Sequence, residues 1–204
     1  MKIFKKNKYP AYLEDDLSVG KQAVIFVWEI FKVVVISLAI IVPVRYYLIK
    51  PFYVKGASME PTYYDHEYLI INELSYHLGS PVRGDTVVFK YPLDPSQYFI
   101  KRVIGMPGET IKIADGYVTI INQANPKGVQ LVEHYLEDSV RTMGDVDVTL
   151  GPDEYYLLGD NRLASLDSRV FGPVKEEFIV GKTLFRGWPI NRIGIVTNNL
   201  EYNL

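Results

Sequence analysis

A serine occurs in the segment Gly56-Ala57-Ser58-Met59-Glu60-Pro61-Thr62, directly after the long apolar segment of the chain. Small residues precede Ser58, and Pro61 restricts the backbone just after it, so we expect a turn at the end of a strand. A turn of this kind displays the serine hydroxyl, as a nucleophile requires. Gly-Ala-Ser is also ordinary loop sequence, so the nucleophile hypothesis needs a second residue that activates the hydroxyl.

A lysine in a predicted strand can supply this activation. Side chains alternate along a strand, so Lys101 shares one face with Phe99 and Val103. An amine held between apolar side chains is desolvated, which lowers its pKa from about 10.4 and lets it accept a serine proton near neutral pH. The alternative is an edge strand from which Lys101 points to water.

A third cluster of polar residues runs from Gly159 to Arg169 and can form hydrogen bonds and ion pairs. Its alternative interpretation is a polar surface loop. A calcium loop is not expected, because Arg162 and Arg169 interrupt the acidic residues and the EF-hand spacing is absent. The chain has no cysteine and three histidines, so we expect no thiol nucleophile, no metal site and no cofactor.

Length and charge limit the function classes. With 204 residues, 48% of them hydrophobic, the chain can form one anchored domain of roughly 150 residues. The net charge is −2, with 22 basic and 24 acidic residues, which gives no electrostatic basis for binding nucleic acid. We therefore expect no nucleic-acid partner.

An apolar segment near the amino terminus predicts a membrane anchor. We assign residues 1–22 to a cytoplasmic tail and 23–49 to a transmembrane helix, because about 20 apolar residues cross a bilayer. Glu29 and Lys32 are charged, but they lie one helical turn apart near the amino end, where they can pair or snorkel. A cleaved signal sequence is the rival interpretation, but no small-x-small site follows the segment.

Charge bias predicts the topology of this anchor. Five basic residues precede the span and three follow it, which favours a cell-membrane protein with a cytoplasmic amino terminus and an extracytoplasmic domain. Four aromatic residues after the span would suit the far membrane interface or begin the core of the domain: Tyr46, Tyr47, Phe52 and Tyr53.

Residues 50–204 show short apolar runs separated by turn residues, which predicts a mainly β domain with an antiparallel sheet. The expected strands are Tyr68–Ile71, Asp85–Lys90, Phe99–Ile104, Glu109–Ile113, Tyr117–Ile121, Glu154–Leu158 and Gly181–Phe185. Asp115-Gly116 predicts a tight hairpin. Residues 122–151 are expected to form an irregular insertion.

Together these segments resemble the bacterial type I signal peptidases, which are membrane-anchored serine proteases with a Ser-Lys dyad. The resemblance covers nearly the whole chain in the right order. After the anchor it rests on four segments: Gly56–Thr62, Arg83–Phe89, Lys101–Glu109 and Gly159–Gly172.

The resemblance implies that Ser58 is the nucleophile and Lys101 the general base. It implies that Ser165 hydrogen-bonds and orients the lysine. It also implies two ion pairs behind the site, Asp167 with Arg169 and Asp160 with Arg102. All four charged residues are equally compatible with a purely structural role.

Gly56 departs from those members of the family that carry a hydroxyl residue two places before the nucleophile. The oxyanion would then depend on backbone N–H groups, chiefly that of Ser58. Glycine at position 56 also permits close approach of a substrate backbone.

The implied substrates are the signal peptides of exported preproteins, which end in small-x-small sequences, and membrane lipid surrounds the anchor. An extended peptide would bind along the Phe52–Ala57 edge and along the run ahead of Lys101. The expected pocket walls are Met59 and Ile100 for the first pocket and Phe52 and Val54 for the next, with core packing as the alternative for each. Tyr63 is bulkier than the leucine that members of the family often carry at this position.

Three other functions stay open at this point. A Ser-Lys autoprotease would share the dyad but should be soluble. A catalytically silent, membrane-anchored interaction protein would need none of Ser58, Lys101 and Ser165. A Ser-His-Asp hydrolase would depend on one of the histidines.

Overall fold

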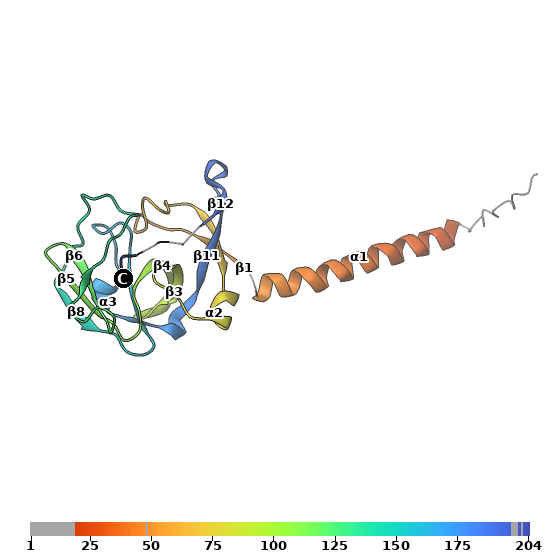
Figure 1. The fold of residues 1–204 in the computed structure, drawn as a ribbon. Helices are drawn as coiled ribbons and strands as arrows, with labels where there is room; N and C mark the ends of the chain where they lie inside the picture. Colours follow the sequence, from red (N-terminus) through yellow and green to blue (C-terminus); the bar gives the residue numbers. More distant parts are fainter. Residues whose placement is uncertain (1–18, 48, 197–199, 201) are drawn as a thin grey trace, which may run out of the picture. The chain divides into compact units, whose positions relative to one another are not determined.

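The computed structural model describes residues 19–47, 49–196, 200 and 202–204 (Figure 1). The chain divides into two units, Met1–Pro43 and Val44–Leu204. Most of the expected cytoplasmic tail and the side chains of Tyr46 and Tyr47 lie outside the described residues. The membrane-interface prediction for these two tyrosines therefore stays untested.

Helix α1 (Val19–Tyr47) covers most of the predicted anchor: it begins four residues earlier than expected and ends at Tyr47, and Ile49, which was assigned to the anchor, begins strand β1 (Ile49–Tyr53). Its segment Val19–Val42 has the length and composition of a membrane span, and its side chains are largely exposed. Lys32 and Glu29 form the expected ion pair, with 2.7 Å between Nζ and Oε1. A pair of this kind lowers the cost of carrying two ionisable groups in an apolar helix.

The second unit is mainly β, as predicted, and its strands form two antiparallel sheets (Figure 1). The larger sheet has the order β1-β2-β11-β3-β4-β9-β10, with β12 paired to β11. Its strands are β1 (Ile49–Tyr53), β2 (Tyr68–Asn72), β3 (Thr86–Tyr91), β4 (Asp94–Gly105), β9 (Glu154–Leu158), β10 (Val174–Lys175), β11 (Ile179–Trp188) and β12 (Gly194–Ile195). Four short helices complete the unit: α2 (Leu74–Leu78), α3 (Ser168–Phe171), η1 (Glu176–Phe178) and η2 (Ile190–Arg192).

The smaller sheet is built around the predicted hairpin. Strands β5 (Thr110–Ala114) and β6 (Tyr117–Ile121) are joined by Asp115 and Gly116, whose φ angles of 53° and 85° are those of a tight hairpin turn. Strands β7 (Val129–Gln130) and β8 (Val146–Thr149) pair with β6 and β5. The prediction that residues 122–151 are irregular throughout was therefore wrong in part.

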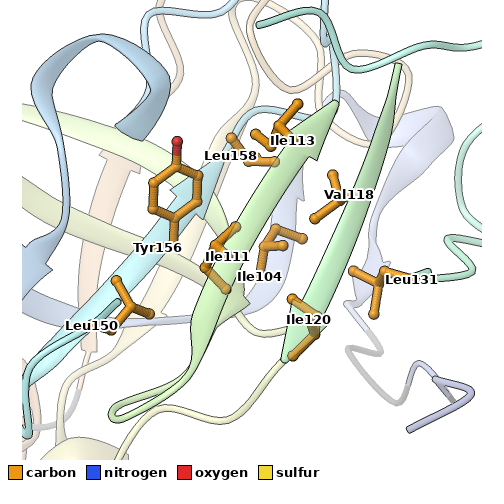
Figure 2. Close-up of a cluster of buried hydrophobic side chains, with 9 residues drawn as sticks. All are labelled: Ile104, Ile111, Ile113, Val118, Ile120, Leu131, Leu150, Tyr156 and Leu158. Atoms are coloured by element: carbon orange, nitrogen blue, oxygen red, sulfur yellow. The ribbon is translucent and has the colours of Figure 1, made fainter. Parts of the chain in front are cut away.

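The main core cluster of this region joins the two sheets (Figure 2). Ile111 and Ile113 on β5 lie beside Val118 and Ile120 on β6, and all four are buried. They pack with residues of the larger sheet and of the connecting segments: Ile104, Leu131, Leu150, Tyr156 and Leu158. The smaller sheet thereby packs against the carboxyl-terminal end of β4 at Ile104, three residues after the candidate lysine.

Candidate active site

Folding brings the two candidate catalytic residues together although 43 positions separate them. The Nζ atom of Lys101 donates to Oγ of Ser58 over 2.8 Å, and also to the carbonyl oxygen of Ile100 over 2.8 Å. Lys101 is paired with Val87 of β3 and is only 3% exposed. The alternative in which this lysine points to water is therefore wrong.

The environment of Lys101 favours its neutral form. Burial lowers the pKa of this amine to about 8, and the more distant carboxylates of Asp167 and Asp160 raise it only in part. No carboxylate among the described residues forms an ion pair with it. A lysine with this pKa is substantially neutral at mildly alkaline pH and can accept a proton.

Arg102, the next residue on β4, has the opposite environment. Its Nε and Nη2 atoms donate to the two carboxylate oxygens of Asp160, over 2.8 and 2.5 Å. Its guanidinium also lies 4.1 Å from the ring centre of Tyr135. Burial alone would lower the pKa of Arg102, but its hydrogen bonds and attraction to Asp160 raise it, so this side chain stays charged.

The loop between β9 and α3 holds the second predicted ion pair. Asp167 receives hydrogen bonds from Nε and Nη2 of Arg169, both over 2.8 Å, and from the backbone N–H of Gly159. Burial alone would raise the pKa of Asp167, but these hydrogen bonds, chiefly those from Arg169, lower it. The carboxylate therefore stays charged and fixes the loop.

Ser165 lies in this loop, but not in the contact that the resemblance implied. Its hydroxyl oxygen is buried, and the described residues include no hydrogen bond from it to Lys101. It lies close enough to Asp167 to lower the pKa of that carboxylate. A Cβ atom built on Gly159 would lie 2.1 Å from Oγ of Ser165 and 2.5 Å from the carbonyl oxygen of Ser58, so only glycine fits between the two serines.

Asn161 joins the nucleophile turn to this loop, a role that the sequence analysis missed. Its side-chain amide donates to the carbonyl oxygen of Ala57, and its backbone N–H donates to that of Ser58, both over 3.1 Å. Its side-chain oxygen accepts from the N–H of Ala164. The polar composition of the loop was visible in the sequence, but nothing there indicated which residue would reach the serine.

Arg162 and Glu133 were also missed. Arg162 is buried, donates through Nε to the carbonyl oxygen of Gly159 over 3.0 Å, and pairs with Glu133. Glu133 belongs to residues 122–151, the segment whose role the sequence did not reveal. One role of this segment is therefore to supply a counter-ion to the loop that holds Ser58.

A groove of about 340 Å³ opens at Ser58 and Lys101. Its walls come from the chain around β1 and from β4, and they include three of the predicted pocket residues, Phe52, Val54 and Ile100. Its lining is made up of residues 52–58, 69, 88, 98–101, 164 and 166.

The expectation that Met59 lines the groove was wrong. Met59 is 1% exposed and packs in the core with Val54 and Leu69 instead of lining the groove. Tyr63 is also fully buried, and its hydroxyl shares a hydrogen bond of 2.7 Å with Oγ1 of Thr183. The bulk of Tyr63 therefore fills the core and does not narrow the groove directly.

Gly56 has a φ angle of 87° and open space around the position of a Cβ atom. Its N–H donates to Oδ1 of Asp65 over 2.8 Å and is thus already bound. Within the described part of the chain, the N–H of Ser58 has no hydrogen-bond acceptor. The Ser58 N–H is therefore a backbone donor available to an oxyanion.

Histidine plays no part in this arrangement. None of the residues that line the groove is a histidine, and the side chain of His66 is 73% exposed on another part of the surface. No cluster of possible metal ligands occurs among the described residues. The chemistry available at the groove is therefore that of a serine hydroxyl and a buried amine.

Comparison with known proteins agrees with this geometry. The family model described as "Signal peptidase, peptidase S26" matches residues 27–188. The chain belongs to this signal peptidase family. The matched residues include Ser58, Lys101 and the loop from Gly159 to Arg169.

Several signal peptidases are similar over most of the chain. The probable signal peptidase I-2 of Synechocystis is 34% identical over 85% of this chain and 78% of its own length. Signal peptidase I of Leptolyngbya laminosa is 35% identical, over 81% of this chain and 82% of that protein. Signal peptidase I of Bacillus amyloliquefaciens is 33% identical, over 80% of this chain and 86% of that protein.

Proposed function

We propose that the chain is a membrane-anchored serine endopeptidase that removes signal peptides from exported preproteins after small-x-small sites. Ser58 is the nucleophile and Lys101 the general base. The observation that carries this proposal is the 2.8 Å contact between the Ser58 hydroxyl and an amine that burial keeps substantially neutral near pH 8. Membership of the signal peptidase family supports the same reaction.

The chemistry proceeds in two steps. Neutral Lys101 accepts the proton of Ser58 while Oγ attacks the scissile carbonyl, and the N–H of Ser58 donates to the oxyanion. The Lys101 ammonium then returns a proton to the leaving amine, which frees the mature protein and leaves the signal peptide as an ester on Ser58. Neutral again, Lys101 takes a proton from the water that hydrolyses this ester.

The groove suits an extended peptide. Strand β1 is an edge of the larger sheet, and no described strand pairs with residues 98–101 of β4 on the side away from β3. A substrate strand can add to such free edges through backbone hydrogen bonds, and the apolar walls at Phe52, Val54 and Ile100 then receive small side chains. This arrangement therefore accepts a substrate in which small residues occur at every second position.

The polar residues behind the groove act as supports. The ion pair of Arg102 with Asp160 holds β4 against the loop after β9, and the pair of Arg169 with Asp167 holds that loop against α3. Ser165 is packed against Gly159 beside the nucleophile turn, and Gly159 separates it from the carbonyl oxygen of Ser58.

The anchor gives the reaction its location. Helix α1 would keep the enzyme at the membrane, with its amino terminus cytoplasmic and residues 50–204 extracytoplasmic, as the bias of basic residues favours. The apolar segment of a signal peptide lies in the same bilayer. Confinement to one membrane raises the effective concentration of substrate.

Cleavage of a model preprotein with an Ala-x-Ala site by the full chain in detergent tests this function. We expect Ser58→Ala and Lys101→Ala to lose activity by about 10²-fold or more while remaining folded, because each removes a reacting group. His134→Ala is the control, because the proposed reaction does not use His134, and it should cleave like the parent.

Each alternative predicts a different result in this experiment. A catalytically silent interaction protein would leave the preprotein uncut in the parent. A Ser-His-Asp hydrolase would require a histidine, and a Ser-Lys autoprotease would cut its own chain instead of an added preprotein. Full activity of Lys101→Ala would show that the base lies elsewhere.

A further inference from the structure

The backbone N–H and C=O groups next to the groove alternate in direction. This alternation identifies the groups that a substrate strand would meet. Val54 donates its N–H to the carbonyl of Glu67 over 2.9 Å, and its own carbonyl accepts from the N–H of His66 over 3.1 Å. Both backbone groups of Val54 thus point towards β2. Because these directions alternate along a strand, the backbone groups of Tyr53, the last residue of β1, point towards the free edge.

Side chains alternate at the same positions. Val54 is 4% exposed and packs in the core, whereas Lys55 on the opposite face is exposed. A strand added at this edge follows the same pleat, so its side chains alternate between the Val54 face and the Lys55 face. In a small-x-small segment the two small side chains pack against the groove wall. The middle side chain then lies on the same face as Lys55.

The position along the edge agrees with this register. Lys55 is three residues before Ser58, where the scissile carbonyl must lie. A strand rises about 3.3 Å per residue, so the middle residue lies roughly 5 to 7 Å before the cleaved bond and the Lys55 backbone about 10 Å before it, a difference that the long lysine side chain can bridge.

Lys55 gives the groove an unbalanced charge. Lys55 and Lys101 are the charged residues that line the groove, and no carboxylate lines it. In the described part of the chain Lys55 has neither a hydrogen bond nor an ion pair. The carboxylate of Asp65, on the neighbouring turn, already accepts from the backbone N–H groups of Gly56 and His66, and it lies 2.9 Å from Nδ1 of His66.

We propose that Lys55 is a specificity-determining residue that favours an acidic side chain at the middle position of the small-x-small segment and disfavours a basic one. The proposal rests on the proposed function and adds a substrate preference to it. An exposed ion pair has a modest effect, so we expect a two- to fivefold preference in kcat/KM for each comparison with a neutral residue.

Three otherwise identical peptides test this preference, with Ala-Glu-Ala, Ala-Gln-Ala or Ala-Lys-Ala before the cleaved bond. We expect the full-length parent in detergent to cleave them in that order of kcat/KM. Lys55→Glu should reverse the order, and Lys55→Met should remove most of it. Added salt should weaken the parent's preference, because the pair is exposed to solvent.

Lys112→Glu is the matched control, since it makes the same charge change at an exposed lysine on β5, in the smaller sheet. It should keep the parent's order. An unchanged order in Lys55→Glu, or reversal by Lys112→Glu as well, would overturn the role of Lys55. Failure of the parent to cleave even the neutral peptide would overturn the proposed function, and the preference with it.

Discussion

The two faces of β4 give a buried basic side chain different partners. Lys101 faces the groove and Arg102 the region behind it, and each is 3% exposed. Arg102 is fixed as a cation by a bidentate pair with Asp160, whereas Lys101 has a serine hydroxyl and a carbonyl as neighbours and a pKa lowered to about 8. Burial alone therefore does not make a base, and the absence of a paired carboxylate decides which residue can take up a proton.

Replacing Arg102 should cost the most stability. Arg102→Met would leave the carboxylate of Asp160 buried and without its cation, and we expect the free energy of unfolding to fall by about 3–5 kcal/mol. Urea denaturation followed by tryptophan fluorescence measures this change. A loss below about 1 kcal/mol would mean that the region behind β4 does not depend on the pair.

Replacing Lys101 should have the opposite effect on stability. Lys101→Met removes an amine that is costly to bury, so the variant should lose activity while its free energy of unfolding stays equal to or above that of the parent at neutral pH. The same denaturation experiment measures it beside Arg102→Met. A loss of stability as large as that in Arg102→Met would break the contrast between the two faces.

This contrast also has a pH dependence. Between about pH 8 and the ordinary lysine pKa of 10.5 the unfolded chain binds more protons at Lys101 than the folded chain does. The parent's free energy of unfolding should therefore rise with pH across this window relative to Lys101→Met, by at most about 3 kcal/mol. A constant difference between the two proteins would show that the amine is not desolvated.

Glu133→Gln should lower the stability less than Arg102→Met does. The amide keeps one acceptor for Arg162 but removes the compensating charge, so we expect a loss of about 1–3 kcal/mol in stability. Activity should fall too, because Arg162 holds the carbonyl of Gly159 beside the nucleophile turn. Glu137→Gln, a nearby exposed carboxylate, is the control and should resemble the parent.

Local signals in the sequence predicted much of the fold. Asp115-Gly116 predicted its hairpin because the turn needs two positive φ angles, and strand β9 was predicted with its observed bounds. Strand β11 is longer than predicted, since Trp188 still pairs with Tyr68 beyond an irregularity in the register. Strand β7 has two residues, too few to show any periodicity.

The candidate site was predicted mainly from order and residue type. Alternation in β4 placed Lys101 among apolar neighbours, and the pairing of Arg102 with Asp160 followed from the family resemblance. Sequence alone did not distinguish core residues from residues of the groove wall. Met59 was therefore predicted to line the groove, although it packs in the core. It also did not reveal Asn161 or Glu133, whose contacts are made only when distant loops come together.

The pH dependence of kcat/KM tests most directly whether Lys101 is the general base. A peptide with a neutral middle residue and the full-length parent in detergent would be used, so that the substrate side chain adds no titration of its own. The account predicts a rate that rises through an apparent pKa of about 8, with this limb absent from the residual activity of Lys101→Ala. A rate that stays constant from mildly acidic to alkaline pH would contradict it.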